Sequence, residues 1–159
     1  MDRIGAEFYT LLQCLVALVL GGVIGWERER AGKWAGLRTQ MLICLGATLF
    51  IKAGEFLILG LQDTIRPSAL HADPTNIVQA IMTGIAFIGA GTVFRDRHGH
   101  EAHGLTTAAT MLTVAPIGIA VASERYILAV GATALVFCVL RFVRILECKH
   151  DGKPPDQPR

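Results

Sequence analysis

The sequence predicts an all-α fold, a polytopic transmembrane helix bundle with about five spans. Hydrophobic residues make up 52% of the 159 residues, whereas charged residues make up only 18%. A soluble domain of this size needs more polar surface to cover itself. The chain also has 17 glycines, and small residues allow helices to approach each other closely in a membrane.

Five apolar stretches are long enough to cross a bilayer as helices. They cover residues 8–26, 41–61, 77–94, 105–122 and 126–146. A hydrocarbon core about 30 Å thick requires about 20 helical residues, and a helix satisfies its own backbone hydrogen bonds in lipid. We therefore expect a transmembrane domain over 1–146 and a disordered cytoplasmic tail over 147–159. The first stretch lacks a basic flank and a cleavage site, so we expect an uncleaved span.

The positions of Lys and Arg predict the orientation of the chain. Five spans place the loops 27–40 and 95–104 and the C-terminus on one side, which holds eleven basic residues, and the other side holds three. The positive-inside rule then makes the N-terminus external and the C-terminus cytoplasmic. The net charge of +2 is too small to indicate a nucleic-acid partner.

Two groups of charged residues invite a functional interpretation. The first loop begins GWERERAGKWAGLRTQ, which is either an orientation signal with local ion pairs or a cluster in which Glu27 faces inward to meet Arg38. In the second span, Lys52 and Glu55 are three residues apart and can pair on one helix face. Such a pair is either a functional group within the membrane or a self-neutralising one near the interface.

Small and polar residues recur at helical spacing in three of the spans. They are Gly21 and Gly25 in the first span, Gly84, Gly89 and Gly91 in the third, and Thr106, Thr110 and Thr113 in the fourth. Such stripes indicate close helix packing within one chain or in a homodimer. A polar path across the membrane is the alternative.

No residue pattern indicates a catalytic, cofactor or metal site. The loop RDRHGHEAHG contains His98, His100 and His103, but their spacing matches no strong metal motif, and a solvated polar loop is the simpler interpretation. Cys14, Cys44, Cys138 and Cys148 form no CxxC pair, so neither a zinc site nor a disulfide framework is indicated. We expect the protein not to be an enzyme, because no phosphate-binding loop, HExxH or Ser/His/Asp pattern occurs.

Three segments resemble those of the MgtC/SapB family of bacterial inner-membrane proteins. GGVIGWERERAGKWAGLRTQMLICLGATLF is similar to the family's LGxxIGxERExxxxxAGLRTxxLVxLGAxLF, and DPTNIVQAIMTGIAFIGAGTVF to its DPxRIxxxIVxGIGFLGAG. HGLTTAATMLTVAPIGIA is similar to its VRGLTTAATLWxxAAIGLA. The matches occur in the family's order and cover roughly residues 18–122. The chain departs from the pattern at Ala86, Asn76 and His103. We expect it to lack the ACT-like domain that follows the spans in longer members.

The resemblance implies a function and a set of candidate residues. Family members are linked to growth at low magnesium and to virulence, and some are described as inhibitors of the F-type ATP synthase. It implies a regulator of other membrane complexes, and the alternative is a small transporter or channel for magnesium or another ion. The implied partners are membrane lipid and a complex such as ATP synthase. The motif residues to test are Glu27, Arg28, Glu29, Gly36, Arg38, Thr39, Asp73, Gly89, Gly91, Gly104, Thr106 and Thr107.

Overall fold

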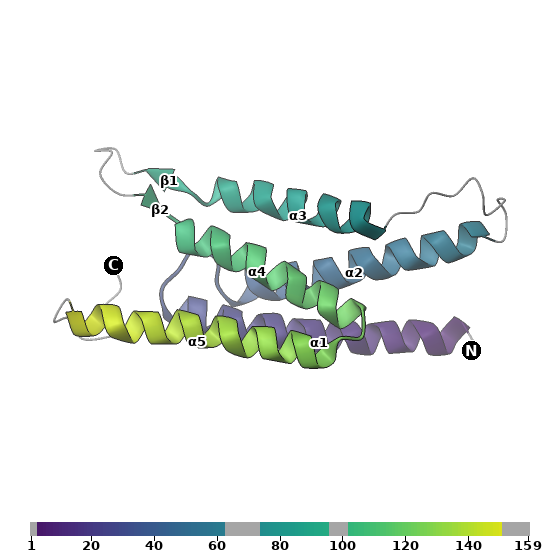
Figure 1. The fold of residues 1–159 in the computed structure, drawn as a ribbon, viewed down its shortest axis with the longest axis horizontal. Coiled ribbons are helices and arrows are strands. Elements are labelled where there is room, and N and C mark those ends of the chain that lie inside the picture. The colour runs from purple at the N-terminus through teal and green to yellow at the C-terminus, as the bar shows by residue number, and fades with distance from the viewer. Residues whose placement is uncertain (1–2, 63–73, 96–101, 151–159) are drawn as a thin grey trace.

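The computed structural model describes residues 3–62, 74–95 and 102–150, and it confirms the helical bundle. Its helices are α1 (Arg3–Arg30), α2 (Leu37–Gln62), α3 (Pro74–Gly91), α4 (Leu105–Ala122) and α5 (Tyr126–His150). Each helix runs antiparallel to the preceding one (Figure 1). The α1–α2 connection, the start of α4 and the C-terminal end of α5 therefore lie at one end of the bundle, which we call the junction end.

The helix bounds follow the hydropathy pattern and extend beyond it. Helix α4 coincides with the predicted span 105–122. Helix α1 continues past the apolar stretch through the helix-forming Glu and Arg residues, and the chain turns at Gly32, whose φ is 65°. Helix α5 continues to His150, beyond the predicted domain boundary at 146, whereas residues 151–159 lie outside the described part of the chain.

Length and apolar composition suit three of the helices to crossing a membrane. Within the described residues these are the segments Ile4–Arg30, Leu37–Gly60 and Leu105–Ala122, and the apolar parts of α3 and α5 are shorter, Thr75–Gly91 and Tyr126–Phe142. Large apolar side chains cover much of the outside of the bundle, and Phe87 and Ile127 are 81% and 92% exposed. Such an outer surface is suited to lipid.

A short β-hairpin separates α3 from α4. Strand β1 (Phe94–Arg95) pairs antiparallel with β2 (Ala102–His103), so that Phe94 is opposite His103. Two residues per strand do not change the all-α class. The pairing brings the end of α3 next to the start of α4 (Figure 1), and the side chains of this hairpin are not described.

Helix α4 lies at the centre of the bundle and packs against each of the other four helices. Ten of its residues are buried. One core cluster joins it to α1, α2 and α5 through Ala17, Ile24, Cys44, Val114, Ile117, Ala120, Val121 and Ala129. A second cluster joins it mainly to α2 and α3 through Ala35, Ala47, Ile81, Ile85, Met111 and Ala115. Its exposed residues Thr106, Ala109, Thr113 and Pro116 recur at helical spacing, so one face of α4 is left uncovered by the other helices.

Candidate functional site

A buried ion pair lies near the end of α1. The Oε2 atom of Glu27 is 2.8 Å from both Nε and Nη2 of Arg28. The two residues are only 4% and 3% exposed. Adjacent helical residues point about 100° apart, so the long Arg28 side chain must fold back along α1 to reach its neighbour. The pair places opposite charges in the protein interior at the junction end.

The predicted contact between Glu27 and Arg38 is wrong. Arg38 is exposed in the first turn of α2, and the Glu27 carboxylate is bound by Arg28 instead. The interpretation with Glu27 facing inward agrees with its burial, but its ion-pair partner is the neighbouring Arg28, which is the local pairing of the alternative interpretation. Burial of Arg28 also removes this residue from any exposed basic surface.

Glu29 and Gly36 act together where α2 begins. The Oε2 atom of Glu29 accepts a hydrogen bond from the backbone N–H of Leu37, at 2.8 Å. A carboxylate at a helix N-terminus satisfies a free N–H group and interacts favourably with the helix dipole. A Cβ atom at Gly36 would lie 2.8 Å from the same Glu29 oxygen, so glycine leaves room for this cap. The motif residue Thr39 is half-buried in the first turn of α2.

Close approach of α1 and α2 confirms the packing predicted for Gly21 and Gly25. A Cβ at Gly21 would lie 2.8 Å from the backbone oxygen of Gln40, and one at Gly25 would lie 2.7 Å from the Cα of Leu37. Helix α2 therefore rests directly on the glycine face of α1. The Gln40 side chain is fully buried near this contact, and neither its Oε1 nor its Nε2 has a hydrogen-bond partner.

The α3–α4 hairpin contains most of the remaining motif residues. Gly104 adopts a φ of 88°, and a Cβ there would overlap the carbonyl oxygen of Thr92. Both features require glycine at the start of α4. Gly89 is buried against Ala108 of α4, with 3.5 Å between the Ala108 Cβ and a Cβ built at Gly89. Thr107 is buried on the inner side of α4.

Two of the glycines predicted to mediate packing contact no other described residue of the chain closely. A Cβ at Gly84 or Gly91 would meet nothing within 4 Å, because these positions face away from α2 and α4. The predicted threonine face of α4 is also divided, since Thr110 is buried whereas Thr106 and Thr113 are exposed. The Thr110 hydroxyl donates to the Thr106 carbonyl at 2.6 Å, as is common for threonine in helices.

The tightest contact between α4 and another helix involves a residue that the motifs did not single out. A Cβ at Gly118 would overlap the Cys44 carbonyl oxygen of α2. The Thr48 hydroxyl donates to the carbonyl oxygens of Gly118, at 2.9 Å, and of Cys44, at 3.1 Å. Glycine and threonine thus join α2 to α4. The sequence contains Gly118 but does not indicate which helix packs against it, so this contact was not predicted.

Polar groups also lie toward the opposite end of the bundle. The predicted pair between Lys52 and Glu55 is confirmed, with 2.9 Å between Lys52 Nζ and Glu55 Oε2. Sequence reasoning missed a second group, in which the Tyr126 hydroxyl of α5 lies 2.9 Å from that of Tyr9 and 3.3 Å from the Nε2 atom of Gln13. These contacts join α5 to α1.

Some predicted residues cannot be placed. Asp73, His98 and His100 lie outside the described residues, and the side chain of His103 is not described. Over the part of the chain that is described, no three His, Cys, Asp or Glu side chains gather closely enough to hold a metal ion. Cys14, Cys44 and Cys138 are free thiols.

Comparison with known proteins identifies relatives over most of the chain. A sequence model of the MgtC family matches residues 14–149. The "Putative magnesium transporter YhiD" of Escherichia coli K12 is 35% identical over 135 residues, which are 85% of this chain and 60% of that protein. Protein MgtC of Salmonella typhimurium LT2 is 35% identical over 131 residues, 82% of this chain and 51% of that protein. Protein MgtC of Brucella abortus is 34% identical over 134 residues, 84% of this chain and 51% of that protein. The chain thus spans between half and three fifths of these relatives, and no solved structure matches it.

Proposed function

This chain belongs to the MgtC family, and from that premise we propose that it is a multi-pass protein of the bacterial inner membrane that regulates another membrane complex. The regulated complex is an F-type ATP synthase or a similar assembly, and the regulation serves growth at low magnesium and virulence. The observation that carries the proposal is the Glu27–Arg28 pair, in which a buried carboxylate is already neutralised by a guanidinium.

The state of the buried polar groups supports regulation over magnesium transport. Magnesium keeps several waters and is held through carboxylates in octahedral geometry. The Glu27 carboxylate faces a cation of the protein itself, and the hydroxyls of Thr48, Thr110 and Thr133 donate to backbone carbonyls of their own helices. These hydroxyl groups stabilise the helices, and the buried side-chain oxygens of the described residues that lack a hydrogen-bond partner, one each on Gln13, Glu27 and Gln40, include a single carboxylate oxygen.

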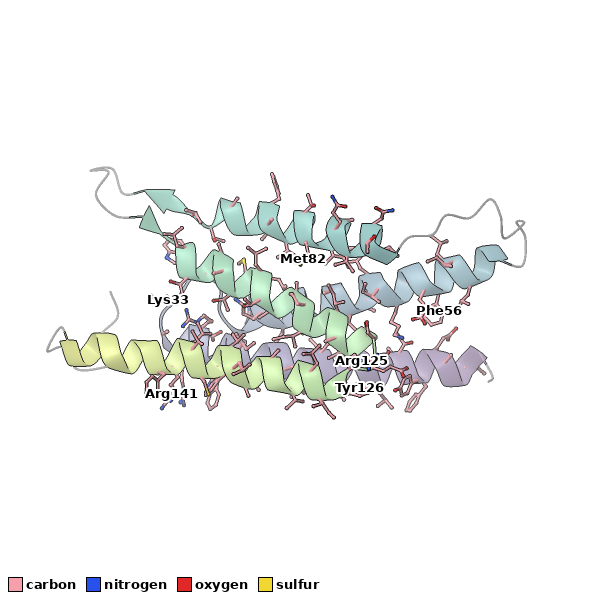
Figure 2. All side chains as sticks on the ribbon, viewed as in Figure 1. Lys33, Phe56, Met82, Arg125, Tyr126 and Arg141 are labelled. Carbon is pink, nitrogen blue, oxygen red and sulfur yellow. The ribbon has the colours of Figure 1, made fainter. Side chains whose placement is uncertain are left out.

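The exposed basic residues of the junction end supply a surface for a partner complex. Lys33 and Arg38 are both exposed there, and Figure 2 shows Lys33 in the connection between α1 and α2. A basic surface steers association with an acidic partner, and the rate of that association falls as salt rises. We expect this surface to dock on a cytoplasmic part of the regulated complex.

A transporter is the second candidate, and two observations favour it. One relative carries magnesium transporter in its name, and Lys52 and Glu55 place an ion pair within an apolar helix. Ionisable residues within spans are functional candidates by default. Transport would require Glu55 to exchange Lys52 for a passing cation.

Two measurements on the purified protein separate the candidates. In liposomes loaded with a magnesium-sensitive dye, regulation predicts no saturable Mg²⁺ uptake. Uptake that is lost in Glu55→Gln or Asp73→Asn would establish transport instead. In membrane vesicles that contain ATP synthase, regulation predicts a lower rate of ATP hydrolysis when the protein is added.

A matched pair of variants tests the docking surface in the same vesicles. Arg38→Gln removes one exposed charge from the junction end, and Arg125→Gln removes one from the opposite end. We expect Arg38→Gln to weaken the effect on ATP hydrolysis and Arg125→Gln to leave it unchanged. Equal effects of the two variants, or an effect insensitive to salt, would contradict docking through this surface.

A further inference from the structure

A cavity opens between α1 and α5 at the junction end. Its volume is about 230 Å³, and it is lined by Trp26, Glu27, Arg30, Phe137 and Arg141. Figure 2 shows Arg141 on the part of α5 that lies at this end of the bundle. The volume is below the range of about 300–1,000 Å³ typical of sites for drug-sized molecules, so the cavity suits a smaller group.

The charges around the cavity favour an anion. Glu27 is the acidic residue in its wall, and Arg28 lies 2.8 Å from that carboxylate and offsets its charge. The guanidinium groups of Arg30 and Arg141 then remain as two positive charges, and no carboxylate among the described side chains forms an ion pair with either. Two arginines that face one cavity from different helices can be bridged by one anionic group.

The position of Arg30 leaves its donors available to that group. Its guanidinium carbon lies 4.2 Å from the centre of the Trp26 ring. Stacking on an aromatic face fixes the guanidinium plane, whereas the N–H groups at its edge stay free to donate. A planar fork of N–H groups matches the oxygens of a phosphate and binds them in pairs. Trp26 and Phe137 provide apolar walls beside the charged groups.

We infer that this cavity binds the phosphate group of an anionic phospholipid headgroup. A basic pocket between transmembrane helices on the cytoplasmic side is a recurrent form of lipid site. Trp26 is half exposed at the end of the apolar part of α1, where headgroups meet the hydrocarbon core and tryptophan is favoured. The lipid would join α1 to α5 at their cytoplasmic ends. This site requires no partner complex, so it can be tested independently of regulation.

Native mass spectrometry of the full chain in neutral maltoside micelles tests the site. The probes are phosphatidylglycerol and phosphatidylcholine with the same acyl chains, because choline cancels the phosphate charge. We expect phosphatidylglycerol to bind saturably and more tightly. Arg30→Gln and Arg141→Gln should each weaken its affinity about fivefold, and the double variant about thirtyfold.

The matched control is Lys33→Gln, which removes one exposed charge at the same end but does not line the cavity. It should change the affinity by less than about twofold, because exposed charges at a distance are screened by salt. Arg30 and Arg141 are themselves exposed, so we expect Arg30→Gln and Arg141→Gln to fold. If the double variant does not fold, the affinities of the two single variants still test the site.

Three outcomes would overturn the inference. Wild-type affinity for phosphatidylglycerol in the folded arginine variants would show that the lipid binds elsewhere. An equal loss in Lys33→Gln would show that only the total charge matters. Inorganic phosphate that displaces the lipid at equal concentration would identify a soluble phosphate compound, rather than a lipid, as the ligand.

Discussion

The substitution Glu27→Gln leaves the Arg28 guanidinium buried without its counter-charge. The substitution Arg28→Gln likewise leaves the Glu27 carboxylate buried without a cation. Loss of one partner of a buried pair typically costs about 3–5 kcal/mol. One oxygen of Glu27 and one nitrogen of Arg28 already lack hydrogen-bond partners, so part of the desolvation cost is present in the native protein. We therefore expect each single variant to lose about 3 kcal/mol of unfolding free energy, at the lower end of that range.

The double variant Glu27→Gln, Arg28→Gln distinguishes a direct pair from two independent buried charges. Because it strands neither charge, its loss should fall below the sum of the single losses by about 1–3 kcal/mol. The assay is reversible unfolding in mixed micelles, followed by helical circular dichroism. The control combines Glu27→Gln with Arg38→Gln, which should be additive within about 0.5 kcal/mol. Additivity for Glu27 and Arg28, or coupling to the exposed Arg38, would refute the pairing.

Three further predictions concern packing, capping and orientation. Gly118→Ala should lower the unfolding free energy by about 1–3 kcal/mol, because its Cβ would overlap a backbone oxygen of α2. The control Gly131→Ala, with open space around it, should change the unfolding free energy by less than about 1 kcal/mol. Similar losses for the two variants in the same unfolding assay would contradict the contact. Gly36→Ala and Glu29→Ala should each weaken the α2 cap by about 1 kcal/mol, seen as faster amide hydrogen exchange in the first turn of α2, and unchanged exchange would argue against the cap. A membrane-impermeant maleimide should label Cys148 only after cell lysis, with Cys148→Ser as the control, and labelling of intact cells would reverse the proposed orientation.

The helices were predictable because their signal is local. Length and apolar composition determine whether a segment can span a bilayer, and the span 105–122 was identified to the residue. Close contact at Gly21 and Gly25 was also predictable, since two glycines four residues apart leave one helix face without side chains. The first turn of α2 then rests on that face.

The site was less predictable because its signals depend on the neighbouring helix. An inward-facing Glu27 was one of two interpretations of the first loop, but adjacent helical residues are not expected to face each other, so Arg28 was not predicted as its partner. Gly84, like Gly25, is a glycine within an apolar helix, yet a Cβ at Gly84 would meet no described atom of another helix within 4 Å. The cavity between α1 and α5 combines residues more than 100 positions apart, and no pattern along one segment could reveal it.

The central position of α4 has a consequence for biosynthesis. Helix α3 packs mainly against α4 and less against α2. It leaves the ribosome before α4, because chains are synthesised from the N-terminus. Helix α3 therefore reaches the membrane ahead of its main partner, and its exposed Phe87 and Ile88 can contact lipid at that stage. Helices α1 and α2 precede α3 and α4 in the chain and can pair through their glycine contact. Helix α4 is then the element that joins this helical hairpin to α3.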